Sequence, residues 1–159
     1  MQFIYDNQMT NNQEENNNWI YPGYHHQTSV QVRFKDVDVM GHVNNSNHFT
    51  YLELARMYYF NEVVTAENDW KKTGFIIAKV TLDYLLPILL NDKIKVFTRC
   101  SRLGNKSFDL EYAIVKKTDN DMQLLARGIS VLVCYDYALQ KSIPLNSTWA
   151  EKVKAFEGF

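Results

Sequence analysis

A short segment rich in turn-forming residues, DVDVMGHVNNSN, contains the side chains of this 159-residue chain that are best suited to catalysis. It includes Asp38, whose carboxylate could act as a general base on water or attack a carbonyl carbon directly. His42 follows four residues later and could orient a substrate or Asp38, or only shape the turn. The alternative for Asp38 is an aspartate that merely caps a turn.

The same segment leads into a predicted helix, whose start is suited to binding an oxyanion. The first N–H groups of a helix have no intrahelical acceptor, and the positive end of the helix dipole lies there. The turn GHVNN therefore presents the backbone amides of Val43, Asn44 and Asn45. Such preorganised donors stabilise the negative charge that develops on a carbonyl oxygen during attack. The segment thus combines a carboxylate with a site for a developing oxyanion.

Hydrophobic periodicity predicts the elements that hold this segment. Residues 28–35 alternate as a strand does, with Val30, Val32 and Phe34 on one face. Over 46–64, apolar residues recur at three- and four-residue spacings and cover nearly the whole circumference, which predicts a buried helix. The period then returns to two, and four more strands and a short closing helix are expected. The strands are predicted at 78–84, 94–101, 108–114 and 125–135, and the helix at 148–156.

This order of elements predicts an α+β fold. A helix that is apolar nearly all round needs a curved antiparallel sheet on one side and further cover on the other. We therefore expect about five antiparallel strands wrapped around one long central helix. The domain is predicted to span residues 28–159, after a polar, Asn-rich extension over 1–27 that is partly disordered. A chain of this length leaves little room for a second domain.

Composition narrows the possible partners and cofactors. A net charge of −1 indicates neither nucleic acid nor an anionic membrane as a partner. The chain starts without a secretory signal and contains no apolar run long enough to span a bilayer, so we expect a cytoplasmic protein. Cys100 and Cys134 lack a CxxC pattern and nearby histidines, which favours two buried, reduced thiols over a disulfide or metal site. No metal or redox cofactor is expected.

The stretch from Val32 to Arg56, VRFKDVDVMGHVNNSNHFTYLELAR, closely resembles the signature of the hydroxybenzoyl-CoA thioesterase-like branch of the hotdog superfamily. This resemblance implies a hotdog fold and hydrolysis of acyl-CoA to a free acid and coenzyme A. Asp38 matches the catalytic aspartate of the family. The resemblance further implies that the Asn45 amide forms the oxyanion hole, assisted by Gly41 or His42. Relatives build such sites between two chains, so a homodimer or a dimer of dimers is expected.

A coenzyme A site also needs donors for the phosphates of the nucleotide. Arg102, Lys106 and Ser107 flank a glycine turn after the third strand, where this family commonly meets the nucleotide. The resemblance therefore assigns these three residues to substrate binding. An ordinary solvated loop is the alternative for each of them.

Two acidic residues near the segment are expected to be structural. Asp36 is predicted to brace the turn or to pair with a base such as Arg56. Glu53 and Arg56 have the i,i+3 spacing of an ion pair along one helix. His48 is expected to face the helix interior or a partner chain.

Other functions on the same fold stay open. An acyl-carrier-protein thioesterase would need a docking patch for an acidic carrier protein in place of a nucleotide pocket. A non-catalytic acyl-thioester-binding module would bind CoA esters without turnover, and the intact Asp38 counts against it. A dehydratase is disfavoured, because the DxDxxGHVNN turn suits thioester hydrolysis. Fold alone does not decide between these functions.

Overall fold

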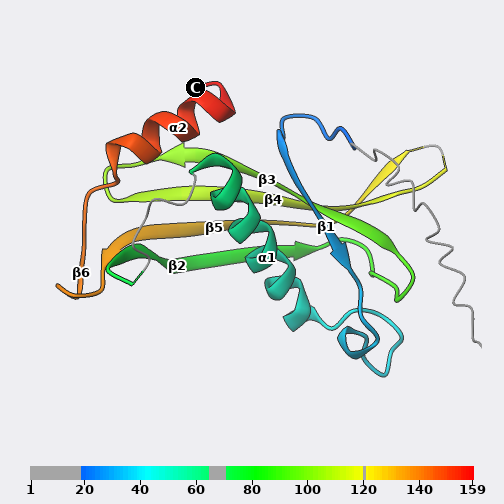
Figure 1. Ribbon diagram of the computed structural model, residues 1–159. Coiled ribbons are helices and arrows are strands. Elements are labelled where there is room, and N and C mark those ends of the chain that lie inside the picture. The colour runs from blue at the N-terminus through cyan, green and yellow to red at the C-terminus, as the bar shows by residue number, and fades with distance from the viewer. Residues whose placement is uncertain (1–18, 65–70, 120) are drawn as a thin grey trace, which may run out of the picture.

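The computed structural model describes residues 19–64, 71–119 and 121–159, which form an antiparallel sheet with a long helix against one face (Figure 1). The strands are β1 (His26–Gln31), β2 (Thr73–Tyr84), β3 (Lys93–Leu103), β4 (Ser107–Lys117), β5 (Met122–Asp136) and β6 (Lys141–Ser142). The helices are the 3-10 turn η1 (Phe34–Asp36), α1 (Asn45–Val63) and α2 (Ser147–Glu157). The first eighteen residues of the predicted extension lie outside the described residues.

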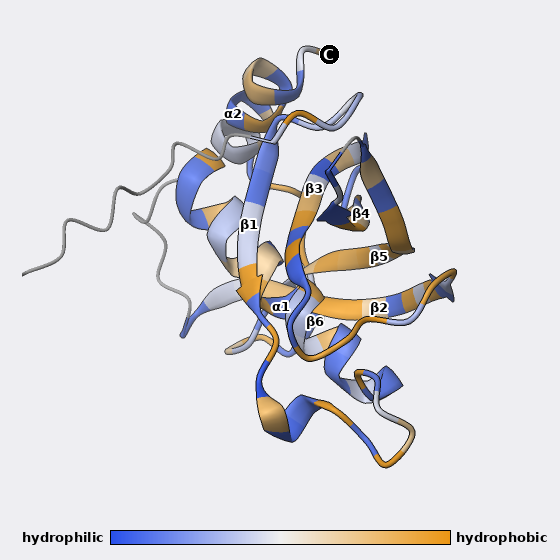
Figure 2. Ribbon diagram, turned by 90° about the vertical axis from the view of Figure 1, so that its right-hand side faces the viewer, coloured by the Kyte–Doolittle hydropathy of each residue, from blue (hydrophilic) through white to orange (hydrophobic). Residues whose placement is uncertain are grey.

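The strands follow the order β1-β3-β4-β5-β2, and the two-residue strand β6 pairs with β5. The five long strands agree with the predicted number, and β6 is an addition that alternation over two residues could not reveal. Within the described part of the chain, β1 and β2 are the two edges of this order. Figure 2 shows the long hydrophobic stretches of β2 and β5. An edge strand of this kind leaves a row of backbone N–H and C=O groups without a neighbouring strand.

The main core lies between α1 and the sheet. Leu52, Ala55 and Tyr59 of α1 are almost fully buried. They belong to one cluster with alternate residues of the strands, including Leu110 and Ile114 of β4. The period of two in the sequence therefore matches the side of each strand that faces the helix.

Two predictions about burial are wrong for the single chain. The helix was expected to be buried nearly all round, yet Phe49, Met57 and Tyr58 are 44%, 57% and 54% exposed. One sheet covers only one side of α1, so the apolar residues on its other sides face outward. Phe34 was expected to face inward with Val32, but β1 ends at Gln31 and the chain turns into η1. Phe34 is consequently 84% exposed.

The opposite face of the sheet carries a second, smaller cluster. Trp19 packs there against Phe97 of β3, and Tyr21 and Tyr24 lie beside the same phenylalanine ring. Lys95 lies over the Trp19 ring at 5.1 Å from its centroid. The described end of the predicted extension thus covers the outer side of β3.

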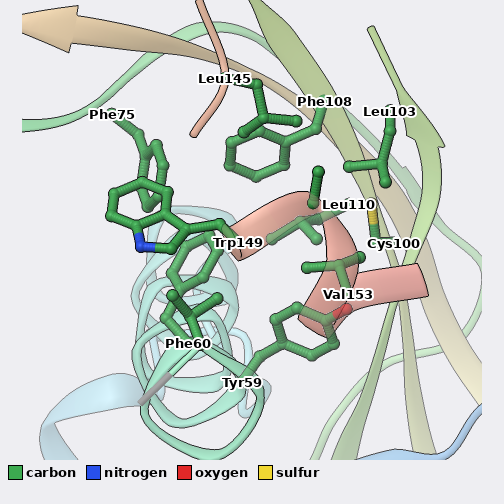
Figure 3. A pocket seen from close by; sticks show the side chains of 12 residues that line it. Tyr59, Phe60, Phe75, Cys100, Leu103, Phe108, Leu110, Leu145, Trp149 and Val153 are labelled. Atoms are coloured by element: carbon green, nitrogen blue, oxygen red, sulfur yellow. The ribbon is translucent and has the colours of Figure 1, made fainter. Parts of the chain in front are cut away.

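Helix α2 closes one end of the core. An apolar pocket lies between α2, the end of α1 and the sheet, where Phe75, Phe108 and Trp149 turn toward one another (Figure 3). The Glu157 carboxylate accepts hydrogen bonds from the Tyr59 hydroxyl at 2.6 Å and from a backbone amide of β3 at 2.7 Å. This buried carboxylate fixes α2 over the pocket.

Cys100 and Cys134 are buried and free, as predicted. Burial raises the pKa of Cys100 to about 12 and that of Cys134 to about 11, so both stay protonated at neutral pH. Neither helix of the described residues is long and apolar enough to cross a membrane.

Candidate active site

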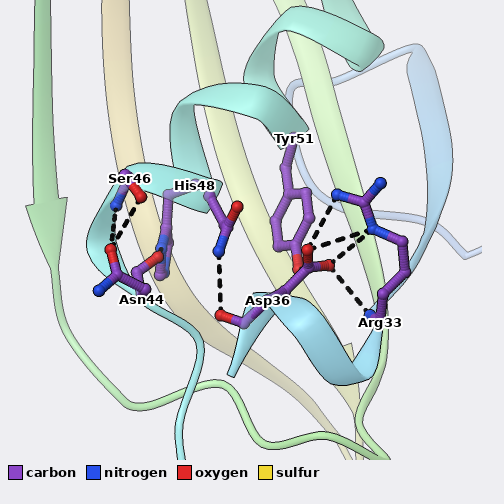
Figure 4. A network of polar contacts seen from close by, with 7 residues as sticks. Arg33, Asp36, Asn44, Ser46, His48 and Tyr51 are labelled. Carbon is purple, nitrogen blue, oxygen red and sulfur yellow. Dashed lines mark hydrogen bonds and ion pairs between the residues drawn. The ribbon is translucent and has the colours of Figure 1, made fainter. Parts of the chain in front are cut away.

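The segment between β1 and α1 is held by a buried carboxylate. Asp36 is 1% exposed and accepts hydrogen bonds from the Arg33 backbone N–H, the Arg33 guanidinium and the Tyr51 hydroxyl, at 2.9 to 3.1 Å (Figure 4). Burial opposes ionisation, but the hydrogen bonds from Arg33 and Tyr51 outweigh it and hold the pKa of Asp36 below its ordinary value. The Asp36 backbone oxygen accepts from Asn44 N at 2.8 Å and Asn47 Nδ2 at 3.0 Å. Asp36 therefore ties the turn to the start of α1.

This arrangement agrees with the predicted bracing role of Asp36 but gives it another partner. The sequence analysis suggested a base such as Arg56, whereas Arg33 closes the ion pair from three residues away. The 3-10 turn η1 brings the two side chains together locally. Arg56 instead points toward Tyr112 in the sheet.

Residues 37–43 form a tight hairpin that carries Asp38. Asp38 N donates to His42 O and Gly41 N donates to Asp38 O, both at 3.0 Å, and an isolated bridge joins Val37 to Val43. Gly41 has a φ of 85°, a left-handed conformation that glycine adopts without strain. The backbone therefore fixes where the Asp38 side chain projects.

The Asp38 carboxylate is partly exposed, and one oxygen is engaged. Oδ1 accepts a hydrogen bond from Met40 N at 2.9 Å. Oδ2 lies 3.9 Å from His42 Nδ1, which is too long for a hydrogen bond but close enough for a charged imidazole to interact with it. The side chains of Asp38 and His42 are 19% and 37% exposed, so water and a ligand can reach both.

The start of α1 offers one open amide. Asn44 is the N-cap, and its side chain accepts from Ser46 N at 3.0 Å. Asn47 N donates to Asn44 O, also at 3.0 Å. Within the described residues, the N–H of Asn45 is left with no acceptor. It is the first helical residue, where the helix dipole favours negative charge.

Two residues that the sequence analysis missed complete the surroundings. The Tyr84 hydroxyl, at the end of β2, donates to Asn45 O at 3.3 Å, and its ring packs edge-on against His48 at 5.0 Å between centroids. Ile88 O accepts from Val43 N at 2.8 Å. His48 is buried, as one of its two predicted placements required, and burial lowers its pKa. The one sequence signal for Tyr84 is that the predicted strand 78–84 ends at this residue.

The predicted nucleotide-binding residues lie elsewhere in the chain. Arg102 pairs with Asp109 through two contacts of 2.7 Å and reaches Ser107 Oγ at 3.3 Å. Lys106 lies in the same β3–β4 turn, and its backbone oxygen accepts from Cys134 N, near the end of β5.

The residues around Asp38 are tied to the other end of β5. Leu85 N and Leu86 N both donate to Leu125 O, and the same segment holds the hairpin through Ile88. Nine residues of strand separate Leu125 from Cys134, about 30 Å. One chain therefore does not bring the β3–β4 turn to Asp38.

Known proteins resemble this chain over most of its length. The family model described as the thioesterase-like superfamily matches residues 32–153. The long-chain acyl-CoA thioesterase FadM of Escherichia coli is 28% identical over 133 residues, covering 80% of this chain and 96% of FadM. The acyl-CoA thioester hydrolase YbgC, also from Escherichia coli, is 24% identical over 123 residues, covering 72% of this chain and 89% of YbgC.

A solved structure matches both sequence and fold. The crystal structure of a Thermus thermophilus thioesterase complexed with coenzyme A and zinc is 34% identical, covers 87% of this chain and 99% of its own, and superposes with a TM-score of 0.75. Together with the antiparallel sheet and its central helix, this match confirms the expected hotdog fold. The family match extends well beyond the catalytic segment, and the chain therefore belongs to the thioesterase-like superfamily.

Proposed function

We propose that this protein is an acyl-CoA thioesterase that hydrolyses a thioester to a free acid and coenzyme A. The observation that carries the proposal is the joint placement of Asp38 and the open Asn45 amide. The hairpin that presents the carboxylate is hydrogen-bonded, through Asp36, to the helix start that presents the amide. A carboxylate and an oxyanion donor, held on one hydrogen-bonded segment, are the two groups that hydrolysis of an activated carbonyl requires.

In the proposed reaction, the thioester carbonyl oxygen accepts a hydrogen bond from Asn45 N–H. Asp38 then either removes a proton from a water molecule that attacks the carbonyl carbon, or attacks that carbon itself. In the first route the carbon–sulfur bond breaks, and the coenzyme A thiolate takes up a proton. In the second route the thiolate leaves an enzyme-bound anhydride, which water hydrolyses to the free acid and restores Asp38.

The neighbours of Asp38 take supporting roles in this proposal. The Gly41 N–H is already engaged with the Asp38 backbone oxygen, so Gly41 contributes the shape of the turn in place of an oxyanion donor. His42, 3.9 Å from Asp38 Oδ2, is within reach of a proton or of the substrate. No metal or redox cofactor enters this mechanism.

The proposed active unit is a homodimer formed along β2. The free edge of this strand exposes Ile76 and Ile77, at 39% and 46%. Antiparallel pairing of two β2 strands about a two-fold axis would extend the sheet across both chains. A dimer of dimers built from this unit is compatible with the same arrangement.

Such a dimer would bring the separated halves of the site together. β2 runs from Thr73, at the same end of the sheet as the β3–β4 turn, to Tyr84, next to Asn45. Antiparallel pairing apposes opposite ends of the two strands. Each Asp38 would then face the turn that carries Arg102 of the partner subunit and Lys106 of the partner subunit, whose charges suit the phosphates of coenzyme A.

A thiol-release assay tests this proposal. Asp38→Asn should lower the rate of acyl-CoA hydrolysis ~10²–10⁴-fold, because a positioned base or nucleophile is lost. The control is Asp119→Asn, since Asp119 is an exposed carboxylate in the turn between β4 and β5, away from the edge of β2. Unchanged turnover in Asp38→Asn would show that the mechanism is wrong.

The rival substrate is tested in the same assay. Parallel reactions with acyl-CoA and acyl-carrier-protein thioesters of equal chain length distinguish the two candidates, because only the first contains the nucleotide. A preference for the carrier-protein thioester would replace the proposed substrate. Binding of acyl-CoA without thiol release would identify a non-catalytic module. The cytoplasmic location stays a prediction from the sequence.

A further inference from the structure

Four residues form a row along the side of α1 that faces β2. Phe49, Glu53, Arg56 and Phe60 are spaced by four, three and four residues, so they share one face of the helix, and we call this row the α1 stripe. Its Phe60 end packs against Phe75 of β2, with ring centroids 4.6 Å apart. Its ends are aromatic, and its centre carries two opposite charges.

The two charges of the α1 stripe form no ion pair with any residue that the structure describes. The Arg56 guanidinium lies beside the Tyr112 hydroxyl, which is buried in the sheet next to Ser130. Among the described residues, no carboxylate forms an ion pair with Arg56, and the predicted pair with Glu53 is absent. Arg56 turns toward the sheet, whereas Glu53 points outward into solvent. A half-buried cation without a carboxylate is costly, so this position favours an acidic partner from outside the chain.

The centre of the α1 stripe is level with the centre of β2. Tyr84 meets Asn45 at one end of α1, and Phe75 meets Phe60 at the other. Interpolation between these two contacts places the point between residues 54 and 55 level with Ala78, in the middle of β2. A two-fold axis through the middle of β2 would therefore also pass the middle of the α1 stripe.

We propose that the α1 stripe is a recognition surface for a second copy of this chain, in which Glu53 pairs with Arg56 of the partner subunit. This inference rests on the homodimer proposed above, and it identifies two side chains that determine how the two chains pair. Residues 53 and 56 are equally far from the axis point between 54 and 55. The two-fold axis makes the helices antiparallel, so each dimer gains two ion pairs, one on each side of the axis.

Charge reversal followed by mixing tests this surface. Glu53→Arg alone would create two Arg–Arg contacts per homodimer, and Arg56→Glu alone would create two Glu–Glu contacts. Each variant alone should dimerise at least about tenfold more weakly than the parent in analytical ultracentrifugation, since like charges replace two attractive pairs. A mixture of the two variants should recover a heterodimer near the parent affinity, because every facing pair is then opposite in charge.

The mixing step separates this surface from an ion pair within one helix. An i,i+3 pair inside a chain would be broken in both variants, and mixing would not repair it. Glu151→Arg, the same charge change at an exposed position of α2, is the control and should leave the dimer intact. Arg56→Gln replaces Arg56→Glu if circular dichroism shows that the latter does not fold. Its mixture with Glu53→Arg should recover part of the affinity.

Three outcomes would overturn the inference: a Glu53→Arg variant that dimerises like the parent, weakened variants that mixing does not rescue, or a monomeric parent. Thiol release by the parent is measured in the same preparations. Hydrolysis of acyl-CoA together with any of these outcomes would remove the recognition surface and leave the proposed chemistry standing. If the parent does not hydrolyse acyl-CoA but the variants weaken and are rescued by mixing, the proposed chemistry is refuted and the recognition surface stands.

Discussion

The Tyr51 hydroxyl offers a sharp test of how the candidate site is held. Tyr51 is 2% exposed, and its hydroxyl donates to the buried Asp36 carboxylate at 2.9 Å. Tyr51→Phe removes this one hydrogen bond and keeps the ring in the core. A hydrogen bond to a charged group contributes about 1.5–3 kcal/mol, so we expect the free energy of unfolding at pH 7 to fall by about 2 kcal/mol.

The effect should depend on pH in a defined direction. The pKa of Asp36 is depressed in the folded protein, so its contribution to stability is present above the unfolded pKa, near 3.9. That contribution is lost as the pH falls through the folded value. Without the Tyr51 hydroxyl the folded pKa moves back toward its ordinary range. The difference between parent and variant should therefore be largest at pH 7 and shrink below about pH 4.

Urea unfolding at pH 7 and at pH 3.5 measures both quantities. The control is Tyr58→Phe, which removes a hydroxyl from a 54% exposed tyrosine of the same helix and should cost little. We also expect kcat to fall in Tyr51→Phe, because Asp36 ties the hairpin that carries Asp38 to the start of α1. Equal stability losses in Tyr51→Phe and Tyr58→Phe, or a loss that does not change with pH, would refute this account of Asp36.

Further predictions concern the turn, the nucleotide site and acid stability. Gly41→Ala and Gly158→Ala impose the same strain, since both glycines have φ near +85° and open space where the methyl group would lie. Each should lower the free energy of unfolding in urea by about 1–2 kcal/mol, but only Gly41→Ala should lower kcat. Equal kcat values for the two variants would show that the turn does not affect catalysis. Replacing Arg102 and Lys106 by alanine should raise KM for acyl-CoA more than for an acyl-pantetheine without nucleotide, and equal changes would remove both from the CoA site. His26 is 2% exposed, and burial lowers its pKa to about 4 despite an exposed carboxylate 3.5 Å away. In the unfolded chain the pKa of the His26 imidazole is near 6.5. The free energy of unfolding should therefore fall by about 3 kcal/mol as the pH drops from 6.5 to 4, and His26→Gln should flatten that part of the stability profile.

The sequence determined those features that depend on neighbours along the chain. The helix start at Asn44 and Asn45 follows from a capping side chain that accepts from an amide two residues later. The hairpin at Asp38 needs only a glycine at a left-handed position and hydrogen bonds within four residues. The strands followed from alternation, since one face of each strand meets α1. These contacts are local, so their signals survive in a single sequence.

Tertiary structure decided which distant residues meet. Tyr84 reaches Asn45 across 39 residues, a contact fixed by the register of β2 and by the path of α1 over the sheet. Arg56 points toward Tyr112, and Asp36 pairs with Arg33 instead, because the angle at which the helix crosses the strands decides what each side chain faces.

The separation of Asp38 from Arg102 has the same origin. The two residues belong to opposite ends of the sheet, and sequence spacing does not reveal how many residues of strand lie between them in space. The open edge of β2 and the uncovered side of α1 also follow from the order of strands, which periodicity leaves undetermined. A period of two or 3.6 states which face of an element is apolar, but the partner that covers that face depends on the packing of the whole domain.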